Sequence, residues 1–241
     1  MHLWQRLKNR EIPDLEWTRE QLDREGYYSQ FGQDKFVAER LSHKRNGVFF
    51  DIGAADGLDI NNTYYFEKEL GWSGVAVEPH PELFQKLARN RRCALVNGGV
   101  SDFNGKAKFL SLREGFGMLS KIVQKPITPE DERRGLDMSW NGEPEGHVLI
   151  PCFTLNEIAR RYHLRTIDFL SIDTEGEELS IVRKIDFSHI EIRLITVERS
   201  DDHDEVERIL QSHGFRLVAT TGCDAIFECP AKRWAFFKSR A

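Results

Sequence analysis

Short apolar runs alternate with helical segments along this chain, and this alternation is typical of an α/β sheet. In the first half, the predicted strands are Val48–Ile52, Gly74–Glu78 and Cys93–Val96, separated by predicted helices at Thr63–Leu70 and Pro81–Asn90. Short apolar runs bounded by turn residues are typical of strands buried on both faces of a sheet. Because strand–helix–strand units follow one another directly, parallel pairing through right-handed crossovers is expected.

The same alternation returns in the second half, but the chain ends differently. Predicted helices at Leu155–Arg161, Glu177–Lys184 and His203–His213 surround predicted strands at Ile167–Ile172 and Ile190–Val197. Two further runs, Gly214–Thr220 and Asp224–Glu228, are joined by a tight turn that contains Gly222. Such a pair predicts an antiparallel hairpin, which parallel units do not need.

Length, charge and cysteine content restrict the class of protein. A chain of 241 residues is long enough for one sizeable core, and its formal net charge of −5 disfavours nucleic acid as a partner. The basic run Arg89–Arg92 is interpreted as a solvated helix end. The four cysteines form no C-x-x-C pair, and no apolar run approaches the ~20 residues of a membrane span. Met1–Glu20 is charged throughout, so a cytoplasmic location is expected.

The domain organisation is predicted from where the periodic pattern is interrupted. Residues 1–30 are polar with scattered aromatics and are expected to form an N-terminal helical extension. The main domain is expected to span 31–230, and 231–241 to be a C-terminal tail. The glycine- and proline-containing segment 113–147 shows no clear periodicity, which predicts an inserted lid or binding loop.

Acidic residues stand at the ends of the predicted strands, where open parallel sheets bind their ligands. Asp51, Glu78, Asp173 and Glu198 all occupy such positions. A carboxylate at the place of Glu78 suits the two hydroxyls of a ribose, although Glu78 could equally cap the helix that follows.

The turn after the first predicted strand indicates which of two classes of adenosine ligand fits, a dinucleotide or a compound without phosphate. It reads Gly53-Ala54-Ala55-Asp56-Gly57, without the G-x-G-x-x-G of a dinucleotide site, and Asp56 would repel a diphosphate. A cationic adenosine compound without phosphate fits better, and S-adenosylmethionine is that compound.

Successive blocks of the sequence resemble the FkbM-type methyltransferases. The blocks are SQFGQDKFV, FFDIGAADGLDINNT, VAVEPHPELFQKL, NGGVSDFNG, TLNEI, IDFLSIDTEGEELSIV and ITVER, in this order over roughly residues 28–230. The resemblance implies a Rossmann-like class I methyltransferase fold, with a seven-stranded, mostly parallel sheet, an antiparallel last strand and helices on both faces. It also implies that S-adenosylmethionine is the methyl donor.

The resemblance implies a role for each matching residue. The expected cofactor-binding residues are Gln33, Asp51, Gly53, Ala54, Ala55, Gly57, Asn62, Thr63, Glu78, Pro79, Ser101, Asp102 and Asp173. Among them, Ser101 and Asp102 are expected near the adenine, and Asn62 and Thr63 near the methionine end or the turn. Gln30, Gln33 and Asp34 are expected to close over the cofactor.

Four side chains are candidates for taking a proton from the acceptor, namely Asp173, Glu175, Glu198 and His147. Asp173 and Glu198 are also the expected ligands if a hard divalent ion such as Mg²⁺ is used. Asp173 and Glu175 have a plain structural alternative, because acids also favour the first turn of a helix.

The expected function is methylation of a hydroxyl group, with a sugar, a polysaccharide or a glycan precursor as the preferred acceptor. The lid, with Phe116, Met118, Trp140 and His147, would hold such an acceptor. The alternatives are O-methylation of a polyketide, lipid or other secondary metabolite, a nicotinamide-dependent oxidoreductase on a similar sheet, and a module that binds the cofactor without turnover. A homo-oligomer is compatible with the sequence.

Overall fold

The computed structural model describes residues 12–112, 118, 120–124 and 145–230. Its main sheet contains β1 (Asp14–Leu15), β2 (Val48–Ile52), β3 (Ser73–Glu78), β4 (Ala94–Asn97), β9 (Thr166–Ile172), β10 (Glu191–Glu198), β11 (Arg216–Thr221) and β12 (Asp224–Glu228). These eight strands lie in the order β1-β11-β12-β10-β9-β2-β3-β4.

The direction of the strands follows the prediction. The strands β4, β3, β2, β9 and β10 are parallel neighbours, whereas β12 lies between β10 and β11 and is antiparallel to both. The antiparallel hairpin at the end of the sheet is therefore confirmed. The two-residue strand β1 extends the edge by pairing with β11 in parallel. Sequence reasoning expected helix in this region and missed β1, because two residues are too few to show a period.

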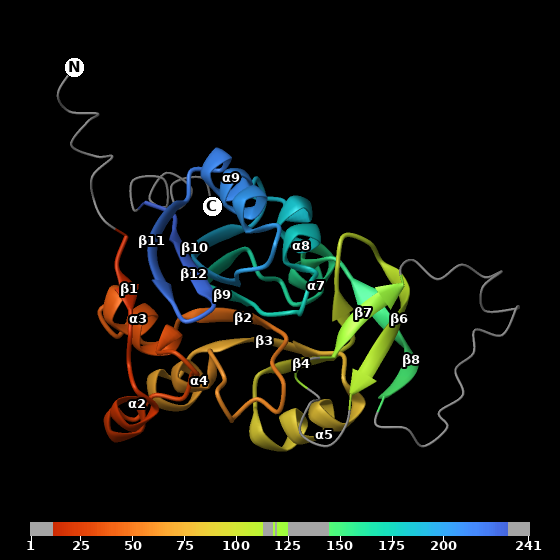
Figure 1. The fold of residues 1–241 in the computed structure, drawn as a ribbon, viewed down its shortest axis with the longest axis horizontal. Helices are drawn as coiled ribbons and strands as arrows, with labels where there is room; N and C mark the ends of the chain where they lie inside the picture. Colours follow the sequence, from red (N-terminus) through yellow and green to blue (C-terminus); the bar gives the residue numbers. More distant parts are fainter. Residues whose placement is uncertain (1–11, 113–117, 119, 125–144, 231–241) are drawn as a thin grey trace, which may run out of the picture.

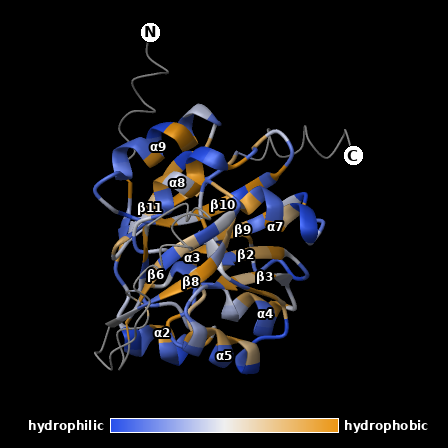
Figure 2. Ribbon diagram, turned by 90° about the vertical axis from the view of Figure 1, so that its right-hand side faces the viewer, coloured by the Kyte–Doolittle hydropathy of each residue, from blue (hydrophilic) through white to orange (hydrophobic). Residues whose placement is uncertain are grey.

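Helices cover both faces of the main sheet (Figure 1). On one face lie α2 (Arg19–Glu25), α3 (Gln33–Arg40), α4 (Tyr64–Leu70) and α5 (Pro81–Asn90), and on the other α7 (Leu155–Arg161), α8 (Glu178–Lys184) and α9 (His203–Ser212). Because side chains alternate along a strand, Phe49 packs with the first group and Phe50 with the second, both fully buried. The helices contain both hydrophilic and hydrophobic residues, as their mixed colours in Figure 2 show, and their buried apolar residues pack against the sheet.

A second, smaller sheet packs beside the strand ends, and sequence reasoning did not anticipate it. It contains β5 (Gly99–Val100), β6 (Gly105–Leu112), β7 (Lys121–Gln124) and β8 (Glu145–Phe153), in the order β5-β8-β6-β7. Its small core includes Ala107, Phe109, Ile150 and Cys152. Within the predicted lid 113–147, the described residues thus contribute β7 and the beginning of β8. Met118 and Ser120 of that segment are also described, whereas its remaining residues, Phe116 and Trp140 among them, and the predicted tail 231–241 lie outside the described residues.

The turn after β2 brings two strand ends into direct contact. Gly53 has a φ of +84°, and a Cβ atom placed on it would lie 1.7 Å from the carbonyl oxygen of Asp173, just beyond β9. The amide of Asp173 donates to the carbonyl of Ile52 at 3.0 Å, so the two backbones are held at this spacing. Only glycine satisfies both the backbone angle and the close approach.

Replacement of Gly53 tests this contact. We expect Gly53→Ala to lower the free energy of unfolding by about 2–4 kcal/mol, because a positive φ and a backbone clash add together. Gly26→Ala is the matched control, because Gly26 has a similar φ of +81° with nothing within 4 Å of the added Cβ. Urea denaturation of both variants measures the difference. If both variants lost the same free energy of unfolding, the close contact between β2 and β9 at Gly53 would not contribute to stability.

Candidate functional site

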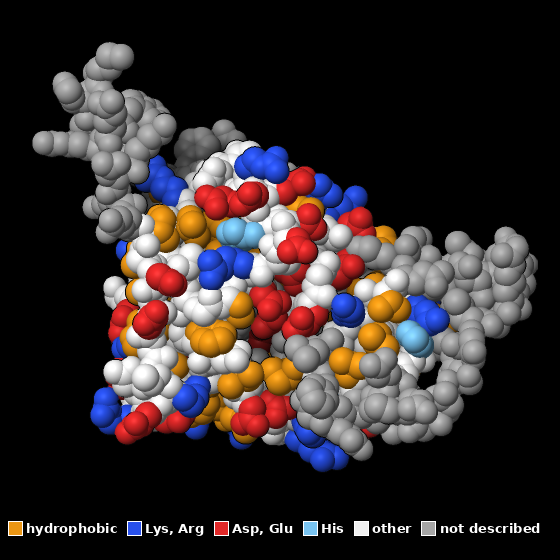
Figure 3. Space-filling view, viewed as in Figure 1, with side chains coloured by type: hydrophobic (Ala, Val, Ile, Leu, Met, Phe, Trp, Pro, Cys, Tyr) orange, Lys and Arg blue, Asp and Glu red, His pale blue; other side chains and the backbone are white. Residues whose placement is uncertain are grey.

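A cavity of about 400 Å³ opens beyond the carboxyl ends of the central strands. Gly53, Glu78, Asp173 and Glu198 line it from the ends of β2, β3, β9 and β10, and Phe109 is among the residues that line it from the second sheet. A smaller recess of about 40 Å³ shares part of this lining. Figure 3 shows acidic side chains gathered in the middle of this face, beside a hollow.

A buried ionic network shapes the loop after β2. The Asp51 carboxylate is buried and accepts hydrogen bonds from Asn61 Nδ2 at 2.9 Å and Thr63 Oγ1 at 2.7 Å. Arg91 lies 3.8 Å from it and donates to Glu67, Asn61 and Thr63. The prediction of a solvated helix end is therefore wrong for Arg91, whose side chain is completely buried. Composition alone could not show that the loop folds back over this guanidinium.

Glu78 connects the ends of β2 and β3. Its two carboxylate oxygens accept hydrogen bonds from the backbone amides of Ala55 at 2.8 Å and His80 at 2.7 Å. Burial raises the pKa of Glu78 to about 8, although both hydrogen bonds act in the opposite direction. The helix α5 is capped by the His80 side chain and not by Glu78, so the capping alternative for Glu78 does not apply.

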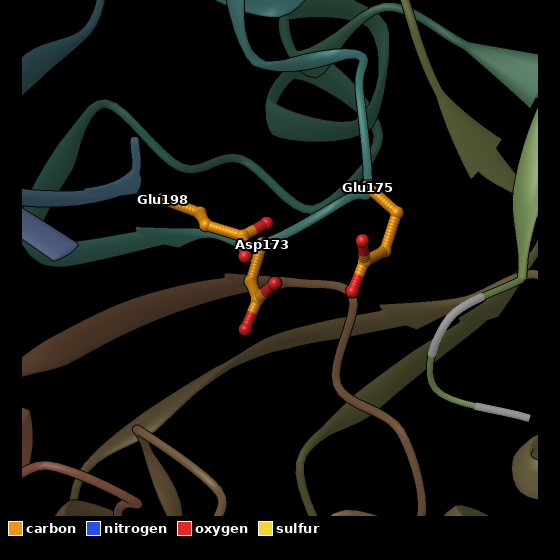
Figure 4. A group of neighbouring side chains, drawn as sticks. All are labelled: Asp173, Glu175 and Glu198. Atoms are coloured by element: carbon orange, nitrogen blue, oxygen red, sulfur yellow. The ribbon is translucent and has the colours of Figure 1, made fainter. Parts of the chain in front are cut away.

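Acidic side chains converge at the ends of β9 and β10. Figure 4 shows Asp173, Glu175 and Glu198 turned toward one space, and one ligand atom from each lies within 4.8 Å of the others. Asp173 opens onto the cavity but is crowded by protein, and this burial together with nearby Asp224 and Glu198 raises its pKa well above the ordinary value. Burial and the neighbouring Glu175 raise the pKa of Glu198 to about 7.

The turn after β2 contains two further residues with a positive φ. Ala55 has a φ of +50°, and Gly57 a φ of +76° with Leu87 Cδ1 2.4 Å from the position of a Cβ. Ala54 is buried and contacts Ala76 and Leu87 beneath the turn. Asp56 accepts from the amides of Leu58 and Asp59, so its carboxylate folds onto its own loop.

Several predicted site residues do not line either cavity. Thr63 supports Asp51, as described above. Ser101 donates to Glu177 at 2.7 Å, and it is Glu177 that reaches the cavity, whereas Asp102 is exposed. His147 pairs with Leu110 on β6, so it shares a face with Leu110 and lies on the opposite face from the cavity residue Phe109. The prediction of His147 as a base therefore has no support in this geometry.

Two segments from opposite ends of the chain meet over the smaller recess. Gln33, which lines that recess, donates through Nε2 to Asp224 at 2.5 Å, and Thr221 Oγ1 donates to the Phe31 carbonyl at 2.5 Å. Asp34 does not line either cavity, because its buried carboxylate holds the amides of Tyr28 and Ser29 instead. Gln30 and Gln33 thus lie beside the recess, whereas Asp34 positions the loop that carries Gln30.

Sequence reasoning missed further residues of the site. They are Phe31, Gly98, Gly99, Glu177, Cys223 and Asp224. Asp224 begins the last strand instead of ending one, and because that strand is antiparallel its beginning lies beside the end of β10. The predicted hairpin therefore already contained a signal that would have found it. Pro79 lines the larger cavity, as predicted, directly after Glu78.

One buried acceptor in the recess has no partner in the described structure. Asn62 donates from Nδ2 to Ser171 Oγ at 3.0 Å, but Asn62 Oδ1 is buried and accepts no hydrogen bond from the described residues. Asn62 lines the recess together with Asp173 and Asp224. An unpaired buried acceptor is costly, so a ligand that donates hydrogen bonds fits this end of the site.

The strand order and the position of the cavity are those of a class I methyltransferase, with the antiparallel strand β12 between β10 and β11. The family described as the methyltransferase FkbM domain matches residues 51–217, which is more than half of the chain. The chain belongs to the FkbM methyltransferase family.

Three similar proteins have low sequence identity with this chain. The methyltransferase sdnD of Sordaria araneosa is 24% identical over 197 residues, covering 70% of this chain and 74% of that protein. The structure of methyltransferase FkbM from Methylobacillus flagellatus KT covers 76% of this chain and 43% of its own, with 16% identity and a TM-score of 0.44. Precorrin-6y C5,15-methyltransferase from Geobacter metallireducens GS-15 covers 82% and 88%, with 12% identity and a TM-score of 0.40. Among the described residues, no helix is long and apolar enough to cross a membrane.

The raised pKa of Glu78 predicts how stability depends on pH. The folded protein keeps this proton between the ordinary pKa of 4.5 and about 8, while the unfolded chain has released it. The contribution of Glu78 to stability is therefore present below pH 4.5 and is lost as the pH rises through about 8.

As the pH rises from 4.5 to about 8, we expect the melting temperature of Glu78→Gln to fall less steeply than that of the wild type, because the amide does not titrate. Thermal melts without added ligand measure the slope, which is independent of any uniform loss caused by the new amide. Glu82→Gln, at an exposed position on α5, is the control and keeps the wild-type slope. Parallel slopes for all three proteins would contradict the raised pKa.

Proposed function

We propose that this protein is an S-adenosylmethionine-dependent O-methyltransferase that acts on a hydroxyl group. The observation that carries the proposal is the chemistry of the cavity lining. Glu78, Asp173, Glu175, Glu177 and Glu198 line the larger cavity, and no lysine, arginine or histidine is among its described lining residues. Such a lining favours a cationic ligand and opposes a diphosphate.

The residues present fit this cofactor. Glu78 stands where it would hold the ribose hydroxyls, and Pro79, Gly98 and Gly99 lie beside it where the adenine would extend. At the other end, Asn62 Oδ1 offers an unpaired acceptor to the ammonium of the methionine portion. Bound S-adenosylmethionine supplies an electrophilic methyl group, so the protein has only to orient the acceptor and take its proton.

The protein's own contribution to the reaction is the group that takes the hydroxyl proton. Glu198 suits this role best, because it faces the cavity and its pKa of about 7 makes it an effective base near neutral pH. Asp173 and Glu175 lie beside it and are the alternative bases. Since water must be excluded while the acceptor is held in line, the wall formed by the second sheet contributes by covering the cavity.

The proposed acceptor is a sugar hydroxyl on a glycan, a polysaccharide or their precursors. Phe109 faces the cavity, and an aromatic ring suits the apolar face of a sugar. Met118 and Ile122 make the same wall apolar, so a polyketide or lipid hydroxyl is the second proposal. The carboxylates oppose acceptors with phosphate groups, which argues against nucleic acid as the substrate.

The oxidoreductase alternative is less well supported by the site. A nicotinamide dinucleotide needs contacts for its diphosphate at a helix N-terminus or from basic side chains. The described lining has carboxylates on both sides of Gly53, namely Glu78 and Asp173. A module that binds the cofactor without turnover is tested by activity.

Ligand binding is the first test of the proposal. We expect calorimetric titration to show binding of S-adenosylhomocysteine and no binding of NAD. Glu78→Ala should weaken the binding by about tenfold or more, because it removes the acceptor for the ribose hydroxyls. Glu82→Ala is the matched control on the neighbouring helix. Binding of NAD alone would overturn the proposal, and binding without methyl transfer to neutral sugars or polyketides would favour the non-catalytic alternative.

A divalent ion is a further proposal for the same carboxylates. Asp173, Glu175 and Glu198 offer oxygen atoms of the kind that Mg²⁺ prefers, within 4.8 Å of one another. If Mg²⁺ takes part, methyl transfer should be lost after treatment with EDTA and restored by Mg²⁺, and calorimetry should detect Mg²⁺ binding that Asp173→Asn abolishes. Full activity in EDTA would show that these carboxylates act without a metal.

A further inference from the structure

Three carboxylates form a row across neighbouring strands of the main sheet. Glu198 is paired directly with Asp224 on the antiparallel strand β12. On its other side, Val197 is paired with Ile172, which places Asp173 beside Glu198 at the end of β9. Because the residues of a row point to the same face, Asp173, Glu198 and Asp224 form a continuous edge of carboxyl groups, which we call the carboxylate row.

Among the described residues, few cations act on the carboxyl groups of this row. Like charges directly opposite each other destabilise a pair of strands, and here two such neighbours occur in succession. Arg199 acts on Asp224, but its guanidinium donates to the carbonyls of Gly222 and Cys223. Lys121 on β7 acts on Glu175, which stands outside the row. The effect of this repulsion is visible in Asp173, where the nearby Asp224 and Glu198 add to burial and raise the pKa well above its ordinary value.

The position of the row relative to Glu78 indicates which part of the cofactor it faces. The strands β3, β2 and β9 are neighbours, so Glu78 and Asp173 are two strand spacings apart, or about 10 Å. Gly53 lies between them and touches Asp173. A ribose held by Glu78 places the sulfur, which is attached to its 5′ carbon, over Gly53 and next to the row.

We propose that the carboxylate row recognises the positive charge of the sulfonium, so that the site selects S-adenosylmethionine over its neutral product S-adenosylhomocysteine. This inference rests on the proposed function. After transfer, the charge of the sulfur is gone while the row remains, so the attraction that held the cofactor is lost. The row therefore favours exchange of product for fresh cofactor.

The ratio of two dissociation constants tests this proposal. In buffer containing EDTA, we expect wild-type protein to bind S-adenosylmethionine about tenfold or more tightly than S-adenosylhomocysteine. Sinefungin, which carries an amine in place of the sulfonium, should bind like S-adenosylmethionine. In Asp173→Asn and in Glu198→Gln, the affinities for S-adenosylmethionine and sinefungin should fall toward the affinity for S-adenosylhomocysteine. The affinity for S-adenosylhomocysteine itself should stay as in the wild type.

The control is Glu191→Gln, which removes the same charge at the opposite end of β10 and should keep the wild-type ratio. Thermal melts establish that each variant is folded, and the comparison of three ligands on wild-type protein needs no variant. Equal binding of all three ligands by the wild type would overturn the charge selection and leave the proposed function standing. Binding of none of them would overturn both.

Discussion

The buried Asp51 carboxylate organises the site, because the residues that satisfy it are those that shape the loop around the cofactor cavity. A carboxylate in the middle of a sheet is stable only with hydrogen-bond partners and a compensating charge. Asn61 and Thr63 come from the loop itself, and Arg91 comes from the end of α5. Since Arg91 also binds Glu67 on α4, one guanidinium connects β2, the loop and two helices.

The site combines rigid backbone with unbalanced charge. Gly53 leaves no room between β2 and β9, so the position of Asp173 is determined by the sheet and not by a flexible loop. The adjacent Glu198 and Asp224 are held in register by β10 and β12. Backbone pairing thereby holds three carboxyl groups close together, although their mutual repulsion favours a larger separation. A cationic ligand, a proton or a metal ion can reduce this repulsion. Each proposal for the site assigns a different one of these three to the carboxyl groups.

The main sheet could be predicted from the sequence because its strands are apolar, short and separated by helices of clear period. The same reasoning predicted the positions of Asp51, Glu78, Asp173 and Glu198, since strand ends are marked by where an apolar run stops. It failed for the second sheet, because it looked for continuous apolar runs. The strand β6 instead alternates polar and apolar residues from Lys106 to Phe109, which is the pattern of a strand with one buried face. It failed for Arg91 as well, because burial of a charge depends on long-range packing that no local pattern records.

The second sheet is joined to the Glu78 end of the cavity through His80. The backbone amide of His80 donates to Glu78, while its Nδ1 accepts from the amides of Glu82 and Leu83 at the start of α5. A neutral ring with its proton on Nε2 satisfies these contacts, and that nitrogen reaches the carbonyl of Leu112 at 2.8 Å at the end of β6.

The chain of contacts continues from Leu112 into the cavity wall. The Leu112 amide donates to Ser120 Oγ at 2.9 Å, and Ser120 lines the cavity, as does Ile122. Hydrogen bonds thus connect Glu78, through His80 and Leu112, with the part of the cavity wall that the second sheet contributes.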